Sequence, residues 1–301
     1  VPSFSVSNKG FRGGGVENAS TLAGATKFGN LSGVEGGYKG ESIAGDTTRY
    51  KVYSGVFCRG AIANGGGGGT SHNAGGGGGS NGGNIGAYNG FGNPTAGFNA
   101  AWNLESAGFA TNVSSGGGRG GYSFSSNNQN PNSICPVPGL GWGGDGRRNM
   151  GGFGGRHLDY STGKIFLGGG GGTGDSNDNQ GAPAGNGGGM VYIVCYGNLS
   201  GAGTILADGG AGTSPINGGS CNGKEGASGG GGGGTVILNV VGTTNLTAAT
   251  AIFARGGAGA NQVFGAPCFN SEAYGPGAGG GGGYIGVTGA LPLNSVIGGT
   301  N

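Results

Sequence analysis

The chain has 301 residues, of which 88 are glycine and only 9% are charged, with a formal net charge of +2. Such weak positive charge, with no stripe of Lys and Arg, argues against a nucleic-acid partner. No apolar run approaches the roughly 20 residues that cross a bilayer, so we expect no membrane insertion. So much glycine is typical of disordered chains. The low charge and the strand-length apolar runs instead predict an ordered protein with an unusual backbone.

Residues 1–50 are less glycine-rich than the chain as a whole. Apolar and polar residues alternate in the segment 4–6 and again over 48–57, as in short strands. We therefore predict an N-terminal β segment over 1–50 and a glycine-rich β-hairpin repeat domain over 51–301. The chain begins with Val1-Pro2 and no signal-peptide pattern, which indicates a processed product or an excised piece.

Residues 64–100 are nearly all Gly, Asn, Ser and Ala, punctuated by single apolar side chains. These side chains are interpreted as caps or pins of the glycine runs; the alternative is that exposed rings stack on a ligand. Residues 101–165 form an irregular loop insertion, and insertions in repeat proteins often carry the binding face. The competing interpretation, slightly favoured, is a packed loop that seals the end of the glycine bundle. The candidate binding residues are Tyr88, Phe91, Phe98, Trp102, Tyr122 and Trp142. We expect Trp142 to be a plug and Trp102 to be the better surface candidate.

An internal repeat dominates the second half of the chain. Residues 187–197 align with 232–242 at a shift of 45 (235 − 190), and 206–212 align with 253–259 at a shift of 47 (254 − 207). Partial copies occur at 58–66 and 281–287. A period of this length predicts a stacked architecture, in which one unit cannot bury its own apolar face.

The strands of the repeat are strongly apolar. The run from Val191 to Tyr196 is apolar on both faces, which predicts a strand buried on both sides. The second copy is similar but is interrupted by Asn239, and a charge at Ile237 is expected to destabilise it by several kcal/mol. The expected core positions, equivalent in adjacent hairpins, are Val191, Ile193, Val236 and Leu238. Glycine interrupts every candidate helix, so the predicted class is all-β with irregular parts and no significant α-helix.

The glycine runs themselves suggest a structure. Polyglycine forms extended left-handed helices of the polyproline-II type, with three residues per turn and about 3.1 Å of rise per residue. Without side chains such helices pack closely and hydrogen-bond to one another, but a single one loses too much entropy to be ordered alone. We therefore predict β-hairpins alternating with polyglycine-II helices that pack as a bundle. The alternative, flexible linkers, fits evenly spaced runs less well.

Candidate chemistry is sparse. The chain has 12 acidic residues and two histidines. His157 lies near Asp159, but no nucleophile-elbow or metal-ligand motif accompanies it, so we predict no enzyme, catalytic residue, metal or cofactor. Cys58 and Cys195 are expected to be buried thiols. The remaining cysteines, Cys135, Cys221 and Cys268, lie in loops, where one disulfide would suit an extracellular setting.

Several segments together carry a resemblance, namely 63–79, 164–179, 186–197, 205–212 and 229–240. They resemble glycine-rich regions of large secreted surface proteins of adhesin type from Bacteroidota and other surface-colonising bacteria, over about residues 55–290. The style is also similar to polyglycine-bundle adhesins at phage tail-fibre tips and to the glycine-rich domain of some receptor tyrosine kinases. The resemblance implies a backbone type and an extracellular, cell-surface location.

The leading expectation is a non-enzymatic extracellular structural or adhesive module whose rigid scaffold presents loops. One alternative is a phage-type tip adhesin that binds a glycan or an outer-membrane protein through residues 85–160. A second is a self-assembling filament subunit, since low charge and open strand edges favour association. The expected partners are accordingly a cell-surface glycan, an outer-membrane protein or other copies of the chain.

Overall fold

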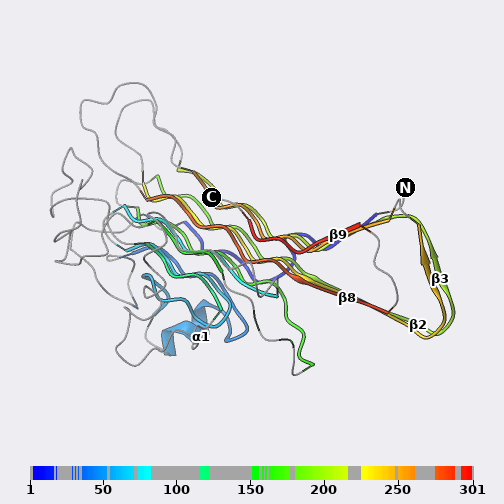
Figure 1. Cartoon of the computed structure of the whole chain (residues 1–301). Helices are drawn as coiled ribbons and strands as arrows, with labels where there is room; N and C mark the ends of the chain where they lie inside the picture. Colours follow the sequence, from blue (N-terminus) through cyan, green and yellow to red (C-terminus); the bar gives the residue numbers. More distant parts are fainter. Residues whose placement is uncertain are drawn as a thin grey trace, which may run out of the picture.

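The computed structural model describes residues 3–16, 18, 29, 31, 33, 36–52, 55–70, 73–82, 116–121, 151–155, 158, 160, 163–176, 180–215, 225–247, 250–261, 275–288 and 293–299. In this part of the chain, wavy extended segments lie side by side and continue into β-sheets at one end of an elongated molecule (Figure 1). The strands are β1 (Ser3–Ser5), β2 (Met190–Cys195), β3 (Leu199–Gly201), β4 (Thr204–Leu206), β5 (Thr235–Val240), β6 (Thr244–Leu246), β7 (Ala251–Phe253), β8 (Tyr284–Val287) and β9 (Leu293–Ser295).

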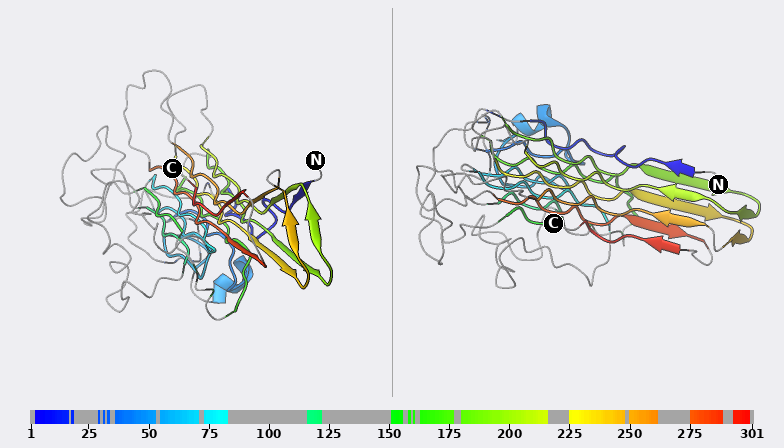
Figure 2. Two further views of the ribbon diagram at one scale, coloured as in Figure 1. Left: turned by 45° about the vertical axis from the view of Figure 1, so that its right-hand side comes forward. Right: turned by 90° about the horizontal axis from the view of Figure 1, so that it is seen from above.

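Equivalent strands of successive repeats pair with one another in parallel. The four-stranded sheet has the order β1-β4-β7-β9, the three-stranded sheet β2-β5-β8, and the two-stranded sheet β3-β6. Each repeat therefore runs out along the three-stranded sheet and returns along the four-stranded sheet. Figure 2 shows the strands of the four-stranded sheet side by side in chain order.

This pairing corrects the expected β-hairpins. In a hairpin the two strands of one unit are antiparallel neighbours, whereas here β2 bonds to β5 and β4 bonds to β7, both in parallel. The physical reason is the repeat itself, because units of nearly equal sequence stack in register and place like residues opposite each other. All-β structure is confirmed for most of the described residues, but the short strand expected over 48–57 is wrong, because its first part forms a short helix, α1 (Thr47–Val52). The Asp46 carboxylate caps α1 by accepting the Thr48 and Arg49 amides at 3.1 and 3.2 Å.

The apolar core lies between the three-stranded and four-stranded sheets. Its fully buried members are Ala207, Val236, Leu238, Ile252 and Ala254. Val191 and Ile193 are partly buried against this cluster, opposite Val236 and Leu238 in the parallel ladder. The four expected core positions are therefore equivalent across the repeat and face the core. Fully burying one such side chain stabilises the fold by about 1.5–3 kcal/mol.

The glycine runs hydrogen-bond to their neighbours with a period of three residues. In the run 229–234, amides three residues apart donate to the same neighbouring segment, so the run has three donor-side neighbours. The bonds are Gly229 to Gly172 (2.9 Å), Gly232 to Gly169 (2.8 Å), Gly230 to Ala278 (2.8 Å), Gly233 to Gly281 (2.9 Å), Gly231 to Gly210 (2.8 Å) and Gly234 to Ala207 (2.6 Å). The segment 168–173 repeats the pattern toward 185–188, 77–80 and 38–41. We call this network of glycine segments the glycine lattice.

The lattice is too tight for side chains. A Cβ added at Gly231 would lie 2.0 Å from the carbonyl oxygen of Asn186, and one at Gly234 would lie 1.9 Å from that of Gly189. Real Cβ contacts are not shorter than 3.0 Å, so these positions accept only glycine. The close approach of backbones explains why glycine fills the runs.

Segments from the first half of the chain belong to the same lattice. The Gly10 amide donates to Gly187 at 2.7 Å, and β1 extends the four-stranded sheet beside β4. Two short runs inside the segment expected to be an irregular insertion, 116–121 and 151–155, also join it, for example through Gly118 N–H to Gly78 O at 2.8 Å. The glycine residues of these two runs thus belong to the glycine lattice and not to a loop.

Candidate functional site

The six aromatic residues proposed from the sequence as binding residues lie outside the described part of the chain. They are Tyr88, Phe91, Phe98, Trp102, Tyr122 and Trp142. The structure instead draws attention to a surface that sequence reasoning treated as core, namely the face of the three-stranded sheet turned away from the four-stranded sheet. We call this surface the outer face.

The outer face is formed by every second residue of three aligned strands. The first row runs across Tyr192, Ile237 and Gly286, and the second pairs Val194 with Asn239. Tyr192 is 54% exposed and Val194 is 42% exposed. The expectation that the strand from Val191 to Tyr196 is buried on both sides is therefore wrong. Its inward residues meet the core, while its outward residues meet solvent although they are equally apolar.

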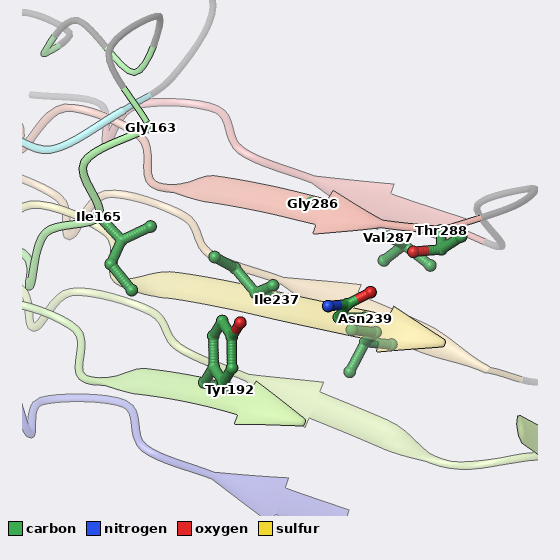
Figure 3. A pocket seen from close by; sticks show the side chains of 9 residues that line it. Gly163, Ile165, Tyr192, Ile237, Asn239, Gly286, Val287 and Thr288 are labelled. Atoms are coloured by element: carbon green, nitrogen blue, oxygen red, sulfur yellow. The ribbon is translucent and has the colours of Figure 1, made fainter. Parts of the chain in front are cut away.

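A hollow of about 610 Å³ lies on the outer face. Figure 3 shows Tyr192 and Ile237 rising from adjacent strands, with Asn239 and Thr288 farther along the sheet. Gly286 continues the row of Tyr192 and Ile237 without a side chain. Side-chain size along this row therefore decreases from an aromatic ring to a branched aliphatic chain to hydrogen. This decrease in side-chain size creates the depression.

Ile165 lines the hollow from outside the sheet, and the segment that carries it is fixed to β5. The Thr235 hydroxyl donates to the Phe166 carbonyl at 2.6 Å, and the buried Asn81 amide donates to the same oxygen at 3.3 Å. The Tyr160 ring meets the Phe166 ring edge-on, with centroids 5.3 Å apart. Ile165 is thus held against the sheet through three contacts made by the next residue, Phe166.

Tyr160 contacts both a segment that hydrogen-bonds to the glycine lattice and the strands of the three-stranded sheet. Its ring stacks on Tyr284 with centroids 4.1 Å apart, and its hydroxyl donates to the Asn81 side-chain oxygen and lies 3.2 Å from the Thr235 hydroxyl. Burial raises the pKa of Tyr160 to about 12, an effect that its hydrogen bonds to Thr235, Phe166 and Asn81 only partly oppose. The Tyr284 ring in turn lies beside Gly286, where an added Cβ would be 3.2 Å from its Cε1 atom. The edge of the hollow at Gly286 is therefore rigidly supported.

The sheet end of the molecule is almost free of charge. No Asp, Glu, Lys or Arg occurs in residues 186–207, 229–254 or 281–299. The nearest charged pair in the repeat is Asp208 and Arg255, which form a salt bridge at 2.6 Å, with the guanidinium 4.5 Å from the Phe253 ring centroid. The pairing raises the pKa of Arg255, with the hydrogen bond to Asp208 as the largest cause. The strands of the outer face consequently offer rings, hydroxyls and amides and no ions, while the exposed Lys164, between the lining residues Gly163 and Ile165, is the charged residue that flanks the hollow.

Other candidate chemistry is limited in the described residues. No group of three or more His, Cys, Asp and Glu side chains in this part of the chain is placed to hold a metal ion. None of the helices described there is long and apolar enough to cross a membrane. Cys58 is buried as expected, whereas Cys195 is only half-buried. Cys135, Cys221 and Cys268 lie outside the described part.

A second, smaller hollow of about 180 Å³ lies at the far end of the sheets, lined mainly by apolar atoms that include Phe4, Ile193 and Leu246. It continues the core between the two sheets and carries few polar groups. The larger hollow on the outer face is the better candidate site because it combines a ring, an amide and a hydroxyl.

Comparison with known proteins gives no match to a family model, to a curated protein or to a solved structure. The site therefore rests on its own geometry. A signal for it was present in the sequence, because the second copy of the repeat places Asn239 at an outward position. A polar residue at that position indicates a face that meets water, and in a stacked repeat the same face continues across Val194 of the first copy.

Proposed function

We propose that the chain is a non-enzymatic extracellular module of a cell-surface protein, with a structural and adhesive role. The observation that supports this most is the glycine lattice, in which segments far apart in sequence are locked by backbone hydrogen bonds with no room for side chains. Such a lattice fixes the positions of the described segments and of the surfaces that they form. A rigid scaffold lowers the entropic cost of binding for whatever it presents.

The lattice is best interpreted as a bundle of polyglycine-II helices. Such helices have three residues per turn, so amides at i and i+3 point to the same neighbour. The runs 168–173 and 229–234 both donate in this way, each to three neighbouring segments. This pattern supports the bundle but with β-arches in place of hairpins, because the strands of one unit lie in different sheets.

The adhesive role has two expected partners, a cell-surface glycan and an outer-membrane protein. The phage-type tip adhesin would use the aromatic residues between 85 and 160, with Trp102 as the main surface candidate. The outer face adds a second surface, built on described strands and free of charge. Both surfaces fit a module that recognises its target through rings and neutral polar groups.

The test is binding of the purified, fluorescently labelled chain to intact bacterial cells. We expect saturable binding, and the partner class follows from pretreatment: periodate destroys glycans, whereas protease removes outer-membrane proteins. Leu238→Asp, which buries a charge in the core, is the control for a chain that has lost its fold. The same low signal for the native chain and for Leu238→Asp on every cell type tested would contradict an adhesive role.

Self-assembly is a second candidate function. Both large sheets end in strands with no further described partner, β1 and β9 in one and β2 and β8 in the other. Open edges of parallel, in-register sheets are templates for pairing with another chain. Light scattering after size-exclusion chromatography tests this, because a filament subunit would elute as a concentration-dependent series of polymers above the 28.4 kDa chain mass.

A further inference from the structure

The outer face differs from the core in how its residues vary between repeats. At the inward positions the three aligned strands carry Val191, Val236 and Ile285 in one row, which are all aliphatic residues of similar size. At the outward positions the corresponding row changes from tyrosine to isoleucine to glycine. Stacking of the repeat requires uniform residues inside, and it places no such requirement outside. The stacking of the repeat therefore does not by itself determine the residues of the outer face.

The groups on this face are available to a ligand. The Tyr192 hydroxyl and the Asn239 amide form no hydrogen bond with another described residue, and both side chains are solvent-exposed. The Thr288 hydroxyl accepts only a long bond of 3.4 Å from the Val240 amide and keeps its proton to donate. The hollow thus offers one ring, one amide with donors and an acceptor, and one hydroxyl, which Figure 3 places around a single depression.

We infer that the hollow on the outer face is a binding site for a neutral carbohydrate, an inference that deepens the adhesive role proposed above and rests on it. A pyranose ring has an apolar face of C–H groups that packs on a tyrosine ring, and an edge of hydroxyls that exchanges hydrogen bonds with amides and hydroxyls. The volume of about 610 Å³ is that of a small-molecule site, which typically holds about 300–1,000 Å³.

The absence of charge selects the class of sugar. Residues 186–207, 229–254 and 281–299 carry no ionic side chain, and the only charged residue adjacent in sequence to a residue of the lining is Lys164, between Gly163 and Ile165. An acidic sugar, a sulfate or a phosphate would leave its hydration shell on strands that offer it no opposite charge, with Lys164 outside the sheet as the single cation beside the hollow. A neutral hexose loses only hydrogen bonds to water, which Asn239, Thr288 and the Tyr192 hydroxyl replace.

The mixture of groups also distinguishes this site from a protein-docking patch. Asn239 and Thr288 line the same depression as the side chains of Tyr192, Ile237 and Ile165. A second copy docking its own outer face would bury the Asn239 amide against residues that offer it few partners. A buried amide without partners is costly, whereas sugar hydroxyls satisfy it.

The experiment measures binding of the whole chain to immobilised short neutral oligosaccharides of glucose, galactose, mannose or N-acetylglucosamine, with sialylated and sulfated forms alongside. We expect binding to at least one neutral sugar that persists at high salt. Tyr192→Ala should weaken it by at least about tenfold, since truncating a central aromatic residue commonly costs that much. Tyr192→Phe should keep most of the affinity because the ring remains, and Asn239→Ala should lose part of it.

Tyr196→Ala is the matched control, because Tyr196 directly follows β2, is 85% exposed and does not line the hollow. All variants lie on the surface, and thermal unfolding confirms that their folds are unchanged. No neutral sugar bound, binding of anionic sugars alone, or equal loss in Tyr192→Ala and Tyr196→Ala would each overturn the inference. Such a result would leave the adhesive role standing if the chain still binds cells, whereas loss of cell binding as well would overturn both.

Discussion

Gly231 lies in the middle of the run 229–234, where a Cβ would sit 2.0 Å from the carbonyl oxygen of Asn186. Ordinary contact begins at 3.4 Å, so Gly231→Ala must move the run away from the segment 185–189 by about 1.4 Å (3.4 − 2.0). Two hydrogen bonds join these segments on either side of the clash, Gly185 to Gly229 at 2.9 Å and Gly188 to Gly232 at 2.8 Å. A shift of that size stretches both bonds beyond the usual limit of roughly 3.2 Å.

Each buried backbone bond lost in this way costs about 1–3 kcal/mol, so the two together cost about 2–6 kcal/mol. Replacing glycine by alanine also restricts the unfolded chain, which returns about 0.4–1 kcal/mol. The net destabilisation of Gly231→Ala is therefore about 1–5.6 kcal/mol. Gly197→Ala is the control, because no atom lies within 4 Å of its added Cβ. Gly197→Ala should show only the stabilisation of about 0.4–1 kcal/mol that comes from restricting the unfolded chain.

The two variants thus differ in sign, which urea unfolding followed by circular dichroism measures directly. Amide hydrogen exchange supplies the local readout, since Gly231→Ala should speed exchange at 185–189 and 229–234 more than at the strands. Equal unfolding midpoints for Gly231→Ala and Gly197→Ala would refute the close packing. Exchange at random-coil rates in both 168–172 and 229–234 of the native chain would refute an ordered lattice altogether.

Two further substitutions test the sheet and its junction with the lattice. Leu238→Asp should destabilise the fold by at least about 3 kcal/mol because it buries an unpaired carboxylate, whereas Ile237→Asp, on the half-exposed outer face, should cost clearly less; thermal melts of equal midpoint would show that the two faces are not distinct. Because the folded pKa of Tyr160 is about 12, above the usual value of about 10, its contribution to stability is complete below pH 10 and is lost as the pH rises toward 12. Tyr160→Phe should therefore lower stability at neutral pH, by removing the bonds to Asn81 and Thr235, and should flatten the decline between pH 10 and 12 in a urea titration; a decline unchanged in the variant would assign it to other groups.

The sequence predicted the strands of the repeat and their inward residues well, because both follow from local patterns, whereas the alternation over 48–57 did not produce a strand and α1 begins there instead. Alternation in the two copies of the repeat places Val236 and Leu238 on the same side of a strand, and stacking of the copies then puts Val191 and Ile193 opposite them. The clustering of glycine between strands likewise indicates close backbone contact. These inferences needed no knowledge of which segments lie next to each other in space.

The pairing of the strands and the exposure of the outer face were not predicted. A period of two residues shows which way side chains point but does not identify the neighbouring strand, so hairpins and stacked arches have the same local pattern. The sequence separation between β2 and β4 was a missed signal. The connection from Cys195 to Thr204 is longer than a tight hairpin turn and contains the additional strand β3. The exposure of Tyr192 could not be predicted for another reason. The sequence pattern of an outward apolar residue is the same whether another part of the chain covers it or a ligand does.

The arrangement of layers also distinguishes the two candidate functions. The repeats contribute β2 with β4, β5 with β7, and β8 with β9, while β1 adds one strand to the four-stranded sheet alone. If a second copy continued the stack beyond β9, its β1 would pair with β9 and its β2 would come one layer later. The three-stranded sheet would then lack a strand between β8 and the next β2, which leaves a gap of about 9–10 Å, twice the usual strand spacing, over the apolar core. End-to-end stacking therefore exposes apolar surface at every junction. We expect the chain to remain a monomer in light scattering from micromolar to millimolar concentration. Polymers at micromolar concentration would show that another segment fills the gap and would favour the filament subunit.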